Sequence, residues 1–214
     1  MPTITKQRPD FKIEQASQKI CCGIDEVGRG PLCGPVVAAA VILPYDTPSE
    51  ILSEIHDSKK LSLKKRTYLF EKINEFAQTS IGEASVEEID EINILNATML
   101  AMTRAFEKLQ TNSNHNPEHI LIDGNRIPKD LPLPAEAVVK GDSKSLSIAA
   151  ASIIAKHHRD LYMAELDKTY PGYGWAKNAG YGTKQHLEAL RKQGVTPHHR
   201  RSFRPVYELI DVNN

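Results

Sequence analysis

The sequence lacks the features that mark disulfide-bonded, secreted and membrane-spanning proteins. Among 214 residues there are only three cysteines, at positions 21, 22 and 33. An adjacent pair without a C-x-x-C spacing argues against both a disulfide framework and a zinc site. The longest apolar run, residues 36–43, is far too short to cross a bilayer, and the amino end lacks the apolar core of a secretion signal. We therefore expect a soluble, cytoplasmic protein with no membrane partner.

The sequence also lacks an excess of charge, internal repeats and low-complexity linkers. Its 27 basic and 27 acidic residues give a formal net charge of zero, so composition does not indicate nucleic acid and the distribution of charge has to be examined. Hydrophobic residues make up 40% and charged residues 25% of the chain, as in ordinary globular proteins. The length suits one sizeable domain, and we predict a single domain over residues 1–214.

Hydrophobic patterning predicts an α/β domain. Five short apolar segments have the length and composition of strands: 20–24, 36–43, 79–86, 119–123 and 135–140. Helical spacing predicts helices over 62–77 and over roughly 144–168, and a last helix between the cap Thr183 and Gly194. Ser85 and Glu88 form a capping-box pattern ahead of a further helical stripe over 95–109. Because the first strands follow one another along the chain, a mixed sheet is favoured over a strictly parallel one.

Acidic side chains stand where three of these strands end. Asp25 and Glu26 end the first strand, Asp123 ends the fourth and Asp142 follows the fifth. Ligand sites of open α/β sheets lie where strands stop, so neighbouring strands would gather four carboxylates in one small volume. Two unit charges about 4 Å apart repel by about 4 kcal/mol at an effective dielectric constant of about 20. An all-oxygen set of this kind suits Mg²⁺ or Mn²⁺.

Each acid also has an ordinary structural interpretation. Asp142 precedes a helix and could be its N-cap, which is the interpretation favoured for that residue taken alone. Asp123 before a glycine is a common turn, and Asp25 with Glu26 could form an exposed strand end. Taken singly, none of these signals is specific.

The adjacent pair Asp25 and Glu26 sets a geometric condition. Neighbours in a regular strand point to opposite faces, so both can face one ion only if the strand distorts there. Gly28 and Gly30 follow directly and supply the backbone freedom for such a distortion.

Six blocks of sequence resemble ribonuclease HII in order and spacing: "GIDEVGRGPLCGPVVAAAVIL", "DSKKLS", "LIDGN", "KGDSKSLSIAAASIIAKHHRD", "GYGTKQH" and "HHRRSF". The match spans residues from about 20 to 206. It implies a ribonuclease H-like fold, with a mixed central sheet of about five strands flanked by helices and a small helical extension over about 177–214. It implies a metal-dependent endoribonuclease that hydrolyses the RNA strand of RNA–DNA hybrids and incises 5′ of single ribonucleotides embedded in duplex DNA. A role in ribonucleotide excision and DNA repair, and action as a monomer, follow from the same likeness.

The resemblance also carries roles onto the acids. The family's four acidic residues fall on Asp25, Glu26, Asp123 and Asp142, the set that the strand ends select. Two Mg²⁺ or Mn²⁺ ions are expected with substrate, giving 3′-hydroxyl and 5′-phosphate ends because water is the nucleophile. Asp25 is expected to bind both ions and Glu26 and Asp123 to bind directly, while Asp142 binds one ion or orients a water.

Substrate contacts are implied as well. The family's Gly-Arg-Gly element falls on Gly28, Arg29 and Gly30, where the absence of side chains lets backbone N–H groups approach a ribose 2′-hydroxyl. The family's substrate tyrosine falls on Tyr181, which is expected to stack on the neighbouring sugar. Secondary candidates for phosphate contacts are Lys59, Lys60, Ser143 and Lys144.

A basic segment lies near the end of the chain. From Lys177 to Arg204 there are seven Lys or Arg residues and one acid, a balance suited to neutralising the phosphates of a duplex. The histidines there, His186, His198 and His199, have no clear zinc spacing and are interpreted as surface or nucleic-acid contacts.

Two other functions remain as alternatives. Another two-metal nuclease of the same fold would cut DNA that contains no ribonucleotide. A non-catalytic module would bind hybrids without cutting, although the four acids argue against it. A phosphate-binding glycine loop is disfavoured, because "GRGPLCG" lacks the Lys-Ser/Thr ending of a P-loop.

Overall fold

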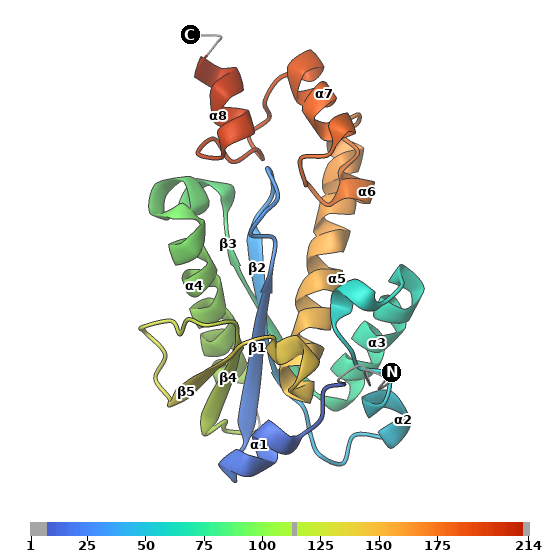
Figure 1. The fold of residues 1–214 in the computed structure, drawn as a ribbon, viewed down its shortest axis with the longest axis vertical. Helices are drawn as coiled ribbons and strands as arrows, with labels where there is room; N and C mark the ends of the chain where they lie inside the picture. Colours follow the sequence, from blue (N-terminus) through green and yellow to red (C-terminus); the bar gives the residue numbers. More distant parts are fainter. Residues whose placement is uncertain (1–7, 113–114, 212–214) are drawn as a thin grey trace, which may run out of the picture.

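A five-stranded mixed sheet lies at the centre of the computed structural model, which describes residues 8–112 and 115–211 (Figure 1). The strands are β1 (Cys21–Val27), β2 (Val36–Ile42), β3 (Gln78–Ala84), β4 (His119–Asp123) and β5 (Ala135–Val138). They stand in the order β3-β2-β1-β4-β5. The first three strands form antiparallel pairs, whereas β4 runs parallel to β1 and β5 parallel to β4. The predicted mixed α/β sheet is confirmed.

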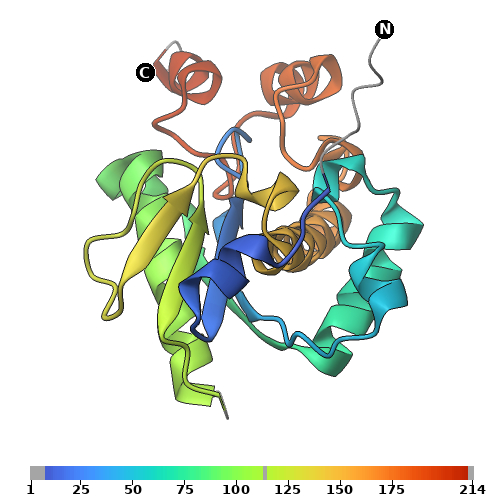
Figure 2. The same ribbon diagram turned by 60° about the horizontal axis from the view of Figure 1, so that its bottom comes forward.

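Helices cover both faces of this sheet (Figures 1 and 2). The helix α4 (Val86–Asn112) lies on one face, and α5 (Leu146–Thr169) and α3 (Leu63–Phe76) lie on the other. Alternate residues of β2 serve the two cores, with Ala38 on the α4 side and Ala39 on the α5 side. Gly23 of β1 permits the approach of α5, because a Cβ there would lie 2.3 Å from the Ser147 carbonyl carbon.

Polar caps set several helix boundaries. The Ser62 hydroxyl accepts the Lys65 N–H at 3.3 Å and starts α3. Ser145, not Asp142, is the N-cap of α5, since its hydroxyl accepts the Ile148 N–H at 3.2 Å. The capping interpretation of Asp142 is therefore wrong.

Helix α4 begins at the capping box that the sequence predicts, and it contains a kink. Ser85 and Glu88 form the expected capping box at its start, with reciprocal hydrogen bonds of 2.9 and 3.2 Å. Asn93 then adopts a φ of 66° and breaks the helix into two segments. The apolar stripe from Leu95 onward lies in the second segment, and the kink itself leaves no mark in that pattern.

The C-terminal helices form a cap at one end of the molecule, beyond the loop that joins β1 to β2 (Figure 1). They are α6 (Trp175–Asn178), α7 (Lys184–Gln193) and α8 (Arg204–Asp211), and they enclose a separate apolar cluster around Trp175. Thr183 caps α7 as predicted, accepting the His186 N–H at 3.4 Å. Residues 212–214 of the predicted extension lie outside the described residues.

Short helices complete the fold. They are α1 (Lys12–Ser17), α2 (Ser49–Leu52) and the 3-10 turns η1 (Ser58–Lys60) and η2 (Gly141–Ser143). None is long enough to leave a helical pattern in the sequence. Of the helices in the described residues, none is both long and apolar enough to cross a membrane.

Candidate active site

The sheet register brings the predicted acids to one place. β1 and β4 are adjacent and parallel, with Ile24 opposite Ile122, so Asp25 and Asp123 are the next residues at the same end of both strands. The chain then returns through β5 to η2, which carries Asp142. The Gly141 N–H donates to Asp123 Oδ1 at 2.6 Å, and this bond ties η2 to the end of β4.

The carboxylates lie close enough to shift one another's pKa values. Burial, followed by repulsion from Glu26 and Asp123, raises the pKa of Asp25 well above its ordinary value. Burial also raises the pKa of Glu26, with Asp123 adding to the shift and Arg29 opposing it. The pKa of Asp142 is raised by burial and then by the charge of Asp123. Because the carboxylates repel one another, the site favours the binding of protons or cations, which reduce its negative charge.

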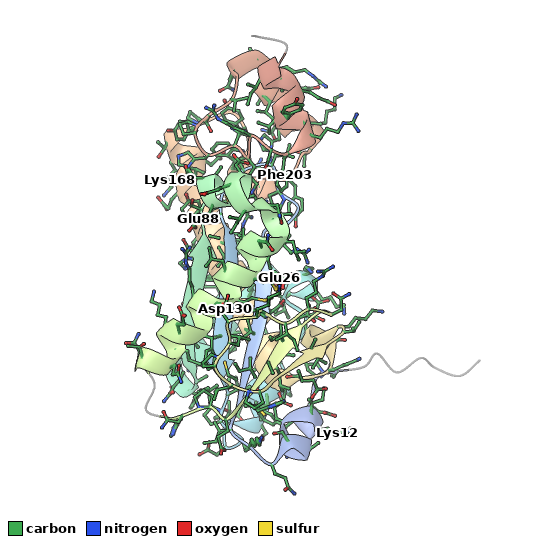
Figure 3. The ribbon with its side chains drawn as sticks, turned by 90° about the vertical axis from the view of Figure 1, so that its left-hand side faces the viewer. Lys12, Glu26, Glu88, Asp130, Lys168 and Phe203 are labelled. Atoms are coloured by element: carbon green, nitrogen blue, oxygen red, sulfur yellow. The ribbon has the colours of Figure 1, made fainter. Side chains whose placement is uncertain are left out.

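One oxygen of Glu26 has no partner. Glu26 Oε2 is buried and makes no hydrogen bond with the described residues, while Oε1 lies 3.4 Å from Arg29 Nη1. Figure 3 places this side chain midway along the molecule, between Lys12 beyond one end of the sheet and Phe203 near the C-terminal helices. A buried, unpaired carboxylate oxygen among mutually repelling acids fits a hard divalent cation.

The expected distortion of β1 is absent. The ladder with β2 continues in register to Val27 opposite Val37, so Asp25 and Glu26 leave opposite faces of a regular strand. The pairing with β4 stops at Ile24, however, and Asp25 Oδ1 accepts the Glu26 N–H at 2.7 Å. Both carboxylates are therefore near Asp123 because the neighbouring strand has ended, and the strand itself need not bend.

A fifth acid near the site is Asp57, which the sequence reasoning missed. Its side chain caps η1 by accepting the Lys59 N–H at 3.0 Å, and the Lys60 Nζ lies 3.1 Å from it. Asp57 also raises the pKa of Asp142, which Lys59 and Lys60 lower. These two predicted lysines are thus near the acids. Asp57 does not end a strand, and only its place in the "DSKKLS" block could have indicated it.

Ser143 and Lys144 flank Asp142 on the same turn. Both are half-buried, and the Ser143 hydroxyl donates to the Lys140 carbonyl at 2.9 Å.

The predicted recognition residues also come together. Arg29 and Gly30 are exposed in the loop after β1, which Gly28 opens with a φ of +93°. Tyr181 is 47% exposed, and its ring atom Cε1 lies 3.3 Å from the point where a Cβ on Gly30 would be. A loop tyrosine and the glycine-rich turn therefore form one surface, although about 150 residues separate them along the chain.

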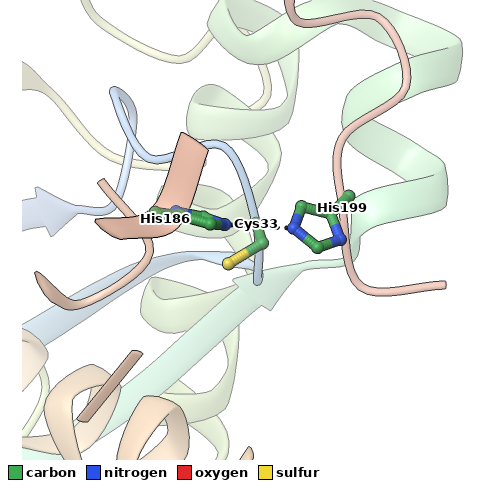
Figure 4. A group of neighbouring side chains, drawn as sticks. All are labelled: Cys33, His186 and His199. Carbon is green, nitrogen blue, oxygen red and sulfur yellow. Dashed lines mark hydrogen bonds between the residues drawn. The ribbon is translucent and has the colours of Figure 1, made fainter. Parts of the chain in front are cut away.

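The expected exposure of the histidines is wrong for two of them. His186 and His199 are fully buried, and burial lowers the pKa of His199 to about 3. Their ring nitrogens Nε2 lie 3.0 Å apart, close to the Cys33 thiol (Figure 4). The cause is the separate apolar cluster of the C-terminal helices, which the sequence pattern did not reveal.

Hydrogen bonds engage both imidazoles of this cluster. His186 Nδ1 donates to the Tyr181 carbonyl at 2.9 Å, and His199 Nδ1 accepts the Thr196 N–H at 3.0 Å. His199 Nε2 must therefore carry a proton and donate to His186 Nε2. Burial raises the pKa of the Cys33 thiol to about 12. The two imidazoles are thus engaged with each other and with backbone groups of Tyr181 and Thr196.

The basic segment divides into two parts. Six of its Lys and Arg residues are exposed: Lys177, Lys184, Arg191, Lys192, Arg201 and Arg204. Arg200 is fully buried and cannot contact phosphate directly.

The fold and the site together define a class. A mixed sheet with carboxylates gathered at the ends of two adjacent parallel strands is the arrangement expected of a nuclease with the ribonuclease H-like fold.

Comparison with known proteins identifies the family. A sequence model described as ribonuclease HII matches residues 22–207. A ribonuclease HII of Magnetococcus marinus is 59% identical over 94% of this chain and 95% of its own length, and one of Paramagnetospirillum magneticum is 56% identical over 94% and 98%. The crystal structure of ribonuclease H2 from Pyrococcus horikoshii superposes with a TM-score of 0.71 at 25% identity, covering 90% of this chain and 97% of the other. The chain belongs to the ribonuclease HII family, and it is an endoribonuclease that acts on RNA in RNA–DNA hybrids.

Proposed function

We propose that the enzyme incises on the 5′ side of single ribonucleotides embedded in duplex DNA as well as cutting longer hybrids. The site for this reaction is the acid cluster of Asp25, Glu26, Asp123 and Asp142. The observation that carries the proposal is the buried, unpartnered Glu26 Oε2 among carboxylates whose charges raise one another's pKa. Divalent cations would neutralise these carboxylates, and we propose that two Mg²⁺ or Mn²⁺ ions bind at the site together with the substrate.

Each acid has a distinct task in this proposal. Asp25, Glu26 and Asp123 would hold the cations through their carboxylate oxygens. When bound, the cations supply a water of lowered pKa and stabilise the negative charge on the leaving oxygen. Asp142 orients the attacking water from η2, and the products carry 3′-hydroxyl and 5′-phosphate ends.

The loop after β1 recognises the ribose. Backbone N–H groups of residues 28–30 approach the 2′-hydroxyl, the group that distinguishes RNA from DNA, and the Tyr181 ring stacks on the next sugar. Arg29 holds a neighbouring phosphate, with Lys59, Lys60, Ser143 and Lys144 as further phosphate contacts. Exposed basic residues of the 177–214 extension bind the duplex, and the protein acts as a monomer.

The test compares a DNA duplex that contains one ribonucleotide with the same duplex lacking it. We expect 5′ incision of the first only, with Mg²⁺ or Mn²⁺ and not with chelator. Asp123→Asn should abolish it, whereas Asp130→Asn, which changes an exposed carboxylate in the connection between β4 and β5, should not. Cutting of the all-DNA duplex would support a DNA nuclease instead, and binding without cutting would support a hybrid-binding module.

A further inference from the structure

Two arginines are buried under the glycine-rich loop without a carboxylate partner. Arg159 of α5 is 1% exposed and Arg200 is fully buried. In the described residues, every hydrogen bond that their guanidinium groups donate goes to a backbone carbonyl. Arg200 reaches the carbonyls of Gly28, Arg29, Pro31 and Gly34 at 2.5 to 3.0 Å. Arg159 reaches those of Cys33, Pro35 and Ala179 at 2.8 to 3.0 Å.

These bonds fix which way the loop presents its amide groups. In a trans peptide the C=O and the following N–H point in opposite directions. Because the Gly28 and Arg29 carbonyls point inward to Arg200, the N–H groups of Arg29 and Gly30 point outward from it. The loop therefore displays donors on the side away from the core.

Arg159 also connects this loop to the segment that carries Tyr181. Arg159 spans both, since it donates to Cys33 and to Ala179, two residues before Tyr181. The Leu32 N–H donates to the Gly180 carbonyl at 2.8 Å and strengthens the link. Tyr181 is thereby held against Gly30.

We propose that Arg159 and Arg200 are positioning residues that determine selectivity for ribose. They do not touch the substrate. They hold the amide donors of residues 28–30 and the Tyr181 ring in one fixed relation, and this arrangement favours a sugar with a 2′-hydroxyl over one without it. The inference rests on the recognition role proposed above for the loop and Tyr181.

Chemistry favours arginine over lysine at both positions. A guanidinium presents five donors in a rigid plane and can bridge several carbonyls at once, whereas an ammonium is a compact and more strongly hydrated charge. Arg200→Lys and Arg159→Lys thus keep a long basic side chain but lose the planar set of donors. A purely structural role predicts lower thermal stability with unchanged selectivity.

The experiment measures selectivity apart from stability. KM and kcat are determined with Mg²⁺ on the duplex containing one ribonucleotide, and the inhibition constant of the all-DNA duplex is measured as its competitor. For either variant we expect the KM for the duplex with one ribonucleotide to rise about tenfold, because that is the effect of losing one hydrogen bond to a polar group. The inhibition constant of the all-DNA duplex should stay within about twofold of the wild-type value. Leu109→Ala, which opens a cavity in α4 on the other core, is the control. Leu109→Ala should lower Tm without changing the ratio of KM to the inhibition constant.

The outcomes separate the two proposals. If wild type shows no ribonucleotide-dependent incision, the proposed function fails. If wild type incises selectively but a folded arginine variant keeps the wild-type ratio, the positioning role is refuted. The positioning role is also refuted if Leu109→Ala changes the ratio of KM to the inhibition constant as much as the arginine variants do. It is refuted as well if neither arginine variant folds, because the arginines then serve the fold alone.

Discussion

The ring of Tyr181 lies directly over Gly30, with Cε1 3.3 Å from the position of a Cβ on that glycine. Gly30→Ala should displace the ring by a few tenths of an ångström and narrow the approach to the loop amides. We expect kcat/KM on a single-ribonucleotide duplex to fall about tenfold, as for a misplaced contact of this size. Because the φ of Gly30 is not positive, Tm should change little.

Variants of the tyrosine provide the controls for this prediction. Tyr181→Phe keeps the ring that stacks and should keep most of the activity, whereas Tyr181→Ala should lose at least as much as Gly30→Ala. Equal activity for Tyr181→Ala and wild type would show that the ring takes no part in recognition. Circular dichroism melting checks that all three variants are folded.

Metal removal should destabilise the protein in a way that depends on pH. The folded pKa of Asp25 is raised by burial and like charges, so its contribution to stability is full below its unfolded pKa and is lost as pH rises through its folded pKa. The chelated protein therefore loses stability as the pH rises, and bound Mg²⁺ offsets that loss because it favours the ionised carboxylate. We expect Mg²⁺ to raise Tm at about pH 7.5 and to raise it less as the pH is lowered.

Asp25→Asn separates this effect from general salt stabilisation. Because the asparagine side chain cannot ionise, the variant in chelator should have a higher Tm than wild type in chelator at the same neutral pH. Added Mg²⁺ should raise the Tm of the variant only a little. Differential scanning fluorimetry with Mg²⁺ or chelator measures both. A full Mg²⁺ shift in the variant would place the cation elsewhere.

The acids could be predicted from the sequence because each lies at the end of an apolar segment, and strand ends of neighbouring strands meet in space. The sequence could not show that β4 stops beside Asp25, which is the reason that Asp25 and Glu26 both reach the site from a regular strand. A basic run normally faces solvent, so the sequence groups Arg200 with the surface cations. Its burial depends on backbone carbonyls more than 160 residues earlier, and no local pattern encodes such an interaction.

His199 should make stability fall in mild acid. Burial lowers its folded pKa to about 3 from an ordinary 6.5, so its contribution is full above pH 6.5 and is lost as pH falls toward the folded value. From about pH 7 to about pH 5 this amounts to about 2 kcal/mol of unfolding free energy. His199→Gln, which has no titrating ring, should be less stable at neutral pH but lose less between the two pH values. Urea unfolding at both values tests this, and identical losses in the two proteins would contradict it.

The exposed basic residues of α7 should govern the salt dependence of binding. Replacing Arg191 and Lys192 by Gln removes two exposed charges, and for each phosphate that is no longer neutralised the slope of log affinity against log salt should fall by about one. Lys168→Gln is the matched control, because this exposed lysine pairs with Glu165 at 2.7 Å near the end of α5. Fluorescence anisotropy with a labelled all-DNA duplex at several salt concentrations measures the slopes. If the double variant and the control share the wild-type slope, Arg191 and Lys192 do not neutralise phosphates of the duplex.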